Sequence, residues 1–211
     1  MNVLLSTYGS RGDVEPLVAL AVQLRALGTE VRMCAPPDEE FTELLAREGV
    51  APVPFDRPWR SWERPPTAEE RQQRVADFID EQYDTVAAAA AGSDVIVATA
   101  MSQFVGPSVA EVLGIPYRYV LFCPDVLDGL DGLGFDALFG APINTHRASI
   151  GLPPVGDVGE FMFTDRPLLA ADPTLGPWRG QKGFEVRQTG AWILPDARPL
   201  PADLLTFLDA G

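Results

Sequence analysis

One short stretch near the amino terminus combines side chains that could bind a phosphate and accept a proton. Gly9–Asp13 contains two glycines, a guanidinium and a carboxylate. The glycines let the backbone turn sharply and approach a ligand closely, and the planar fork of Arg11 suits a phosphate. Asp13 supplies a carboxylate that could remove a proton from a substrate. The stretch lacks the second glycine of the G-x-G-x-x-G fingerprint and the lysine of a Walker A loop, so dinucleotide and P-loop assignments are weakly supported.

Both charged residues also have a purely structural interpretation. Asp13 could cap the helix that follows it, by accepting hydrogen bonds from the backbone N–H groups of Glu15 or Leu17. Arg11 could be a solvated loop charge. The pattern by itself leaves these alternatives open.

The neighbouring elements place this stretch where ligands bind in many proteins. Val3–Tyr8 has the composition of a buried strand, and the apolar residues between Leu17 and Leu27 recur at the spacing of a helix that ends at Gly28. Pro16 is expected in the first turn of that helix, where its missing N–H has no cost. The junction therefore belongs to the carboxyl edge of an open α/β sheet, which is where such sheets bind ligands.

The alternation of strand and helix continues along the chain. Further strands are expected at 30–35, 50–55, 94–99, 115–122, 168–171 and 186–194. Asp38 is a plausible cap for one of the helices, and Thr67 with Glu70 forms a capping-box pattern at the start of another. The sequence therefore predicts a doubly wound, mostly parallel, seven-stranded sheet flanked by helices, a Rossmann-like fold. A short helix is expected at 201–208.

Three other features could belong to a site. Trp59 and Trp62 lie in a long loop, where they could stack on an aromatic or sugar ligand or tuck against the helix that follows. Residues 123–141 carry aspartates without the spacing of an EF-hand, which indicates a flexible, partly helical segment over the site and not a metal site. His146, the only histidine, is expected to be a surface or internally satisfied residue and not a ligand.

Composition excludes several functional classes. The chain has 211 residues, of which 46% are hydrophobic, enough for one large α/β domain with a real core. Its net charge of −14 argues against nucleic-acid partners and against a polybasic membrane anchor. Two isolated cysteines do not make a disulfide scaffold or a zinc site, and they suit a reducing cytoplasm. We expect no signal peptide and no membrane span.

Several motifs resemble those of one enzyme family. Residues 9–20, Gly-Ser-Arg-Gly-Asp-Val-Glu-Pro-Leu-Val-Ala-Leu, closely resemble the start of GT-B glycosyltransferases of the sterol and antibiotic types. The stretches Met33–Pro37, Gly114–Tyr117, Ile150–Val155 and Gln188–Asp196 look like the actinomycete enzymes that glycosylate vancomycin-type glycopeptide aglycones. The resemblance covers nearly the whole chain.

This resemblance implies an inverting glycosyltransferase. It would transfer a sugar from a dTDP- or UDP-sugar to a glycopeptide aglycone or pseudoaglycone, with no metal and no cofactor besides that co-substrate. Asp13 would be the general base, and the N–H groups at the start of its helix would keep it ionised. Ser10, Arg11 and Gly12 would face the diphosphate of the donor.

The resemblance also implies acceptor contacts and a domain division. The loops after the second to fifth strands would hold the aglycone, and the acceptor-binding residues would be Trp59, Trp62, Met101, Gln103, Phe122 and Pro124. Residues 1–200 would form the acceptor-binding domain, and residues 201–211 would begin the linker to a nucleotide-sugar domain outside this chain. Residues 125–141 look shorter than the corresponding family segment.

Three alternative functions are compatible with these patterns. The chain could be an acceptor-binding module that catalyses nothing alone, or half of a glucosyltransferase that acts on a sterol or another lipid. A nucleotide-dependent oxidoreductase is the third alternative, which rests on the α/β pattern only.

Overall fold

A parallel β-sheet organises the structure. The computed structural model describes residues 1–55, 57–61, 67–125, 134–164, 166–180, 183–196 and 199–210. Its sheet has seven strands in the order β3-β2-β1-β4-β5-β6-β7, and every neighbouring pair is parallel. The strands are β1 (Asn2–Tyr8), β2 (Glu30–Ala35), β3 (Ala51–Pro54), β4 (Val95–Ala100), β5 (Tyr117–Leu121), β6 (Leu168–Leu169) and β7 (Arg187–Gln188). The predicted doubly wound, seven-stranded fold is confirmed.

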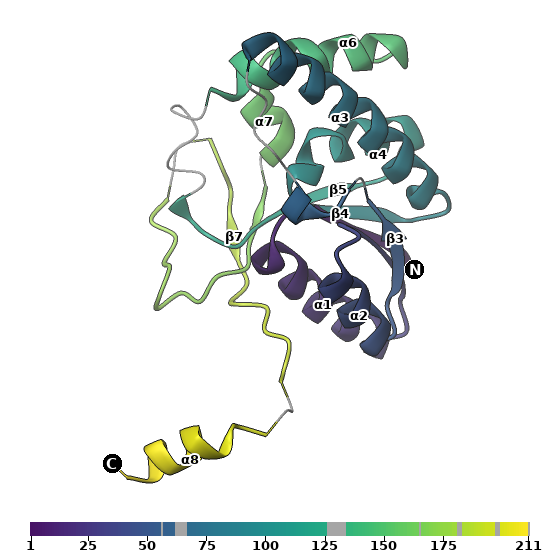
Figure 1. The fold of residues 1–211 in the computed structure, drawn as a ribbon. Coiled ribbons are helices and arrows are strands. Elements are labelled where there is room, and N and C mark those ends of the chain that lie inside the picture. The colour runs from purple at the N-terminus through teal and green to yellow at the C-terminus, as the bar shows by residue number, and fades with distance from the viewer. Residues whose placement is uncertain are drawn as a thin grey trace.

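Helices cover both faces of the sheet (Figure 1). One face carries α1 (Arg11–Ala26) and α2 (Glu39–Arg47). The other face carries α3 (Ala68–Ala90), α4 (Gly106–Leu113), α6 (Ala141–Ser149) and α7 (Val158–Phe163). The connections include the 3-10 turns η1 (Trp59–Ser61) and η2 (Met101–Phe104) and the π-helical turn η4 (Asp136–Gly140). Successive side chains of a strand point to opposite faces, so each strand contributes to two separate cores.

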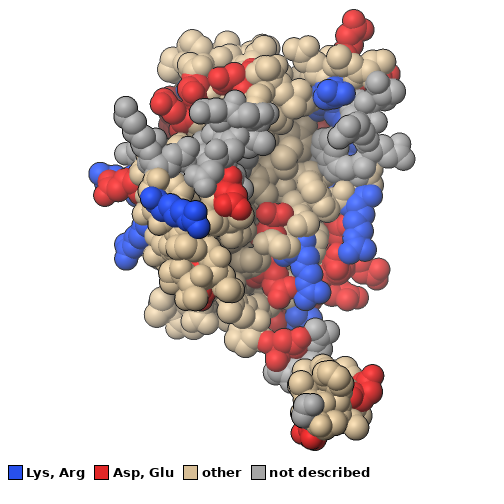
Figure 2. Space-filling model, turned by 90° about the vertical axis from the view of Figure 1, so that its left-hand side faces the viewer, with Lys and Arg blue, Asp and Glu red and all other residues tan. Residues whose placement is uncertain are grey.

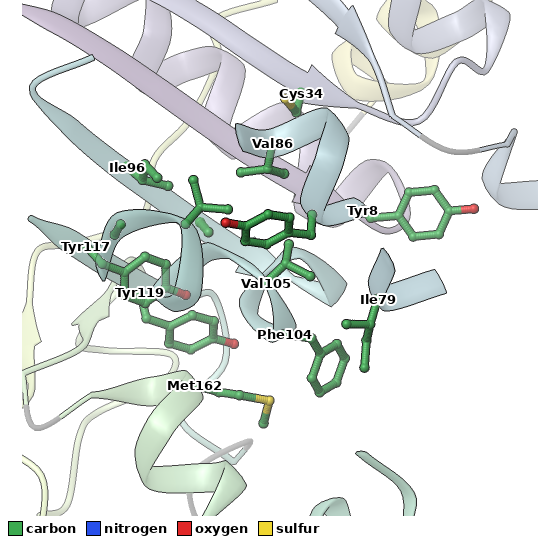
Figure 3. Close-up of a cluster of buried hydrophobic side chains, with 14 of the residues drawn as sticks. Tyr8, Cys34, Ile79, Val86, Ile96, Phe104, Val105, Tyr117, Tyr119 and Met162 are labelled. Atoms are coloured by element: carbon green, nitrogen blue, oxygen red, sulfur yellow. The ribbon is translucent and has the colours of Figure 1, made fainter. Parts of the chain in front are cut away.

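The two cores follow from this alternation along β1. Val3 and Leu5 pack toward α1 and α2, whereas Leu4 and Tyr8 pack toward the α3 layer. Figure 3 shows part of the second core, which includes Tyr8 of β1 and Phe104 of η2. Both cores reach the carboxyl ends of the strands, and so they support the loops at that edge.

The chain reverses its winding direction between β1 and β4. The helix after β1 packs on one face of the sheet, and the elements after β4 pack on the other. Ligands of open α/β sheets usually bind at such a switch point, at the carboxyl ends of the strands. The loop with Asp13 follows β1 and η2 follows β4, so both predicted site segments lie at this switch point.

The last two strands are much shorter than predicted. The stretches 168–171 and 186–194 contribute only the two-residue strands β6 and β7. Gly190 has a φ of +81°, which turns the chain away from the strand direction. Trp192 and Leu194 then pack against the core beneath α1 and α2 instead of extending the edge strand.

Local signals at helix starts are only partly confirmed. Thr67 caps α3 as predicted, with its hydroxyl accepting from the Glu70 N–H at 3.1 Å and the Glu70 carboxylate accepting in return. Asp38 stands at the N-cap of α2, but its carboxylate accepts from the Trp59 N–H at 2.6 Å instead. Pro16 lies inside α1, beyond the first turn where we expected it, so its ring removes an interior N–H.

The capping box gives a direct stability test. We expect Thr67→Ala to lower the free energy of unfolding by about 1 kcal/mol, because the first N–H groups of α3 lose a partner. Thr85→Ala is the matched control, because the Thr85 hydroxyl bonds only to the Glu81 carbonyl within the same helix. Urea denaturation measures both variants, and equal effects would contradict the capping role.

Two other expectations concern the segments around α6. Residues 126–133 lie outside the described residues, but 136–140 are helical, and Phe139 stacks on Phe104 with ring centroids 3.9 Å apart. His146 is satisfied on one side only: its Nδ1 lies 2.6 Å from Oδ1 of Asp80 and its ring packs on Tyr83, whereas its Nε2 is buried with no hydrogen-bond partner among the described residues.

The C-terminal helix stands apart from the rest of the molecule. Helix α8 (Ala202–Asp209) matches the predicted range within one residue, but it projects away from the sheet (Figure 1), and none of its residues is buried. Leu204, Leu205, Phe207 and Leu208 are all exposed. Across the part of the chain that the structure describes, no helix is long and apolar enough to cross a membrane.

Candidate functional site at the carboxyl edge

Ser10 and Asp13 form a reciprocal unit at the start of α1. Ser10 is the N-cap residue and Asp13 is the third residue of the helix. The backbone N–H of Ser10 donates to Oδ2 of Asp13 at 2.8 Å, and the Ser10 hydroxyl donates to the same oxygen at 3.2 Å. Asp13 therefore does not cap the N–H groups of Glu15 or Leu17, as one interpretation proposed. It reaches back to Ser10, so its carboxylate stays at the strand-to-helix junction.

The surroundings of Asp13 make it a better base than expected. Burial raises the pKa of its carboxyl above the usual value, and this effect outweighs the two hydrogen bonds from Ser10, which lower the pKa. The N–H groups at the helix start were expected to favour the charged form of Asp13, but desolvation is the larger effect on the pKa of its carboxyl. A half-buried carboxylate with a raised pKa takes up a proton more readily than a solvated one.

Arg11 and Gly12 occupy the first turn beside this unit. The Arg11 guanidinium is largely exposed and lies along the helix, with Nε 2.5 Å from Oε2 of Glu15. It borders a cavity of about 470 Å³ between α1, α2 and the stretch that contains Leu194. Gly12 is exposed next to Ser10. The i,i+4 pairing partly neutralises Arg11, so a phosphate would have to compete with Glu15 for it.

Trp59 lies against the end of β1. Its ring packs edge-on against Tyr8 at 5.6 Å, and the Tyr8 hydroxyl donates to the Arg57 carbonyl. The indole is half-buried against the core that Tyr8 shares with Phe78 of α3, so it packs toward both β1 and the following helix. Trp62, the other predicted acceptor residue, lies outside the described residues.

The turn after β4 contains two more predicted residues. Met101 is half-buried against the α3-side core, and Gln103 lies in the same 3-10 turn. The preceding residue, Ala100, has a φ of +51°, a left-handed conformation that is uncommon for a residue with a side chain. Ala100 lies where β4 passes into η2, the turn that carries Met101 and Gln103 and that packs beside the end of β1.

Phe122 and Pro124 line a separate part of the same edge. They follow β5 and border a cavity of about 510 Å³, together with Leu175, Trp178 and Arg179. This edge faces the viewer in Figure 2, where basic and acidic side chains are interspersed around a largely uncharged, hollowed area. The predicted acceptor residues therefore form two groups, one around β1 and β4 and one beyond β5.

Sequence reasoning missed the far wall of this cavity. Trp178 and Arg179 lie in a loop that Gln188 of β7 holds: its side chain accepts from the Trp178 N–H and donates to the carbonyls of Ala171 and Gly176. The sequence did contain a signal for this wall. Trp178 and Arg179 are adjacent in a glycine- and proline-rich stretch, a pattern that resembles the one around Trp59.

Asp13 also influences β5 electrostatically. Burial raises the pKa of the Tyr119 hydroxyl, and the negative charge of Asp13 raises it further. The Asp13 carboxylate is thus close enough to β5 for its charge to raise the pKa of a side chain on that strand. This agrees with its place at the switch point of the sheet. Tyr119 lies among the buried residues of the α3-side core (Figure 3).

The fold and the loop from Gly9 to Asp13 lie within a region that matches a known family. Residues 3–129 match the glycosyltransferase family 28 N-terminal domain, and the chain belongs to that family. This family match gives no support to the oxidoreductase alternative, which rested on the α/β pattern alone.

Two curated relatives from Amycolatopsis orientalis match the entire chain. The dTDP-epi-vancosaminyltransferase is 47% identical over 226 residues, and the vancomycin aglycone glucosyltransferase is 43% identical over 240 residues. The chain covers 56% and 58% of these two proteins, so it spans little more than half their length. Among solved structures, the spinosyn forosaminyltransferase SpnP superposes on 97% of the chain with a TM-score of 0.65 at 21% identity, and the match covers 54% of SpnP.

Proposed function

We propose that the chain is the acceptor-binding half of an inverting glycosyltransferase that modifies glycopeptide antibiotic aglycones or pseudoaglycones. The donor would be a dTDP- or UDP-sugar. The observation that carries this proposal is the Asp13 carboxylate, which lies at the switch point of the sheet with a raised pKa and is tied to Ser10. The identity of 43–47% with two vancomycin-group transferases favours a glycopeptide over a sterol or lipid acceptor.

The proposed reaction assigns Asp13 the role of general base. Its carboxylate removes the proton from an acceptor hydroxyl while that oxygen attacks the anomeric carbon of the sugar. The bond from the anomeric carbon to the diphosphate breaks, and the nucleoside diphosphate leaves with the electron pair. Because attack and departure occur on opposite sides, the anomeric configuration inverts.

The chain by itself supports only part of this reaction. Residues 1–200 would hold the acceptor, and residues 201–211 would begin the linker to a domain that binds the nucleotide-sugar. The exposed apolar side chains of α8 are compatible with a linker helix that packs against further protein. Ser10, Arg11 and Gly12 would then face the donor diphosphate across the cleft, and the isolated chain would bind the acceptor without transferring sugar.

The acceptor contacts proposed here lie at the switch point of the sheet and along the cavity beyond β5. Trp59 and Met101 would contact the aglycone next to Asp13, and Phe122 and Pro124 would contact it in the larger cavity. Gln103 and Trp62 remain proposed contacts from the sequence. Trp178 joins them, because it offers an aromatic face at the same cavity.

Calorimetric titration of the chain tests this proposal. We expect a vancomycin-type heptapeptide aglycone to bind, and a dTDP- or UDP-sugar to give no measurable heat. Trp178→Ala should weaken aglycone binding about 10-fold, because an aromatic contact contributes on the order of 1 kcal/mol. Leu27→Ala is the control, since Leu27 is 82% exposed at the opposite edge of the sheet. A folded chain that binds the nucleotide-sugar and not the aglycone would refute the assignment.

A further inference from the structure

The two oxygens of Asp13 have unequal surroundings. Oδ2 accepts both hydrogen bonds from Ser10, at 2.8 Å and 3.2 Å. The same oxygen lies against the backbone of Gly9: a Cβ atom at that position would be 2.3 Å from Oδ2 and 2.8 Å from the Asp13 Cγ. Oδ2 is thus enclosed by the loop that joins β1 to α1.

Gly9 is required by this contact and not by its backbone conformation. Its φ is not among the positive values found elsewhere in the chain, such as +66° at Gly114. Another residue could therefore adopt the Gly9 backbone, but its Cβ would occupy the space that the Asp13 carboxylate now fills. A contact of 2.3 Å is far inside van der Waals distance, so one of the two groups would have to move.

We infer that Gly9 is a positioning residue, which seats one oxygen of Asp13 against the backbone so that Oδ1 alone receives the acceptor proton. This inference rests on the proposed function. Two hydrogen bonds stabilise negative charge on Oδ2 and make it the less basic oxygen. The acceptor O–H then donates its proton to Oδ1, the acceptor oxygen forms the new bond to the sugar, and the electron pair of the broken bond leaves with the diphosphate.

Nuclear magnetic resonance of the 211-residue chain tests the seating directly. In the parent protein, the Ser10 amide proton should follow the titration of Asp13, because the two groups share a hydrogen bond. Gly9→Ala should abolish this pH-dependent shift, whereas Gly156→Ala should preserve it, since a Cβ at Gly156 meets nothing within 4 Å. An unchanged Ser10 titration in Gly9→Ala would overturn the inference.

A double-mutant cycle covers the case in which Gly9→Ala folds poorly. Gly9→Ala should lower the melting temperature of the parent chain but have a much smaller effect in an Asp13→Ala background, because the carboxylate that it displaces is gone. If Gly9→Ala lowers the melting temperature equally in the two backgrounds, the destabilisation does not come from the contact with Asp13, and this result would overturn the inference.

Activity separates this inference from the proposed function. In a two-domain protein that joins this chain to the C-terminal half of a relative, Gly9→Ala should lower kcat on the order of 100-fold with little change in the acceptor KM. Full activity of Asp13→Asn would refute the base itself. Loss of activity in Asp13→Asn with full activity in Gly9→Ala would refute the positioning role alone.

Discussion

Replacing Asp13 by asparagine is expected to lower turnover by about 10²- to 10⁴-fold in the two-domain protein, the usual contribution of a general base. The amide oxygen of asparagine can still accept from the Ser10 N–H, so the loop geometry survives. Asparagine nevertheless lacks the carboxylate that would take the proton from the acceptor hydroxyl. Steady-state kinetics with a glycopeptide aglycone and a dTDP- or UDP-sugar measure the effect, and acceptor affinity should be unchanged. Turnover within a few-fold of the parent would contradict the assignment.

Stability provides the control for this variant. The pKa of Asp13 is raised in the folded state, so the folded chain holds the carboxyl proton more tightly than the unfolded chain does. The contribution of Asp13 to stability is therefore full below the unfolded pKa and is lost as pH rises through the folded pKa. Asp13→Asn should thus melt at a higher temperature than the parent at pH 7, and the difference should shrink in acid. A variant that is less stable at pH 7 would show that its loss of turnover reflects damage to the fold.

Replacing Arg147 by methionine is expected to lower the free energy of unfolding by about 3 kcal/mol. Arg147 is 3% exposed on α6 and donates to the Pro153 carbonyl, the Ser108 hydroxyl and the Glu111 carboxylate at 2.8–3.0 Å. Its guanidinium also lies 5.0 Å from the ring centroid of Phe161. Methionine keeps most of the side-chain volume but leaves these acceptors without their donor.

The expected magnitude depends on which acceptors can reach water. The Glu111 side chain is 44% exposed and can regain solvent, whereas the Ser108 residue is 2% exposed. The loss should thus be smaller than for a fully enclosed ion pair. Arg47→Met is the control, because Arg47 is 66% exposed and pairs with Glu48 on the surface. Urea unfolding of the chain measures both variants. Equal decreases in the free energy of unfolding would contradict a stabilising role for the hydrogen bonds of Arg147.

Local sequence patterns predicted the elements where nearby residues suffice to define them. The Thr67–Glu70 capping box needs partners three residues apart, and it formed as expected. Gly28, predicted to end the first helix, follows α1 with a φ of +81°. The last two strands, β6 and β7, were overestimated, because a strand lasts only as long as a neighbouring strand pairs with it. The Asp38 carboxylate was misassigned for a related reason: Trp59, 21 residues away, supplies the N–H that it accepts from.

The sequence by itself determined the strand–helix alternation, the parallel sheet and the placement of Ser10 and Asp13 at the end of the first strand. These features depend on periodicity and on neighbours within one turn. The tertiary structure decided the raised pKa of Asp13, the enclosure of its Oδ2 by Gly9, and the cavity that joins Phe122 to Trp178. Solvation and shape depend on which distant segments pack around a group. A carboxylate beside a helix start could therefore be located from the sequence, while its basicity was set by the burial that the folded chain imposes.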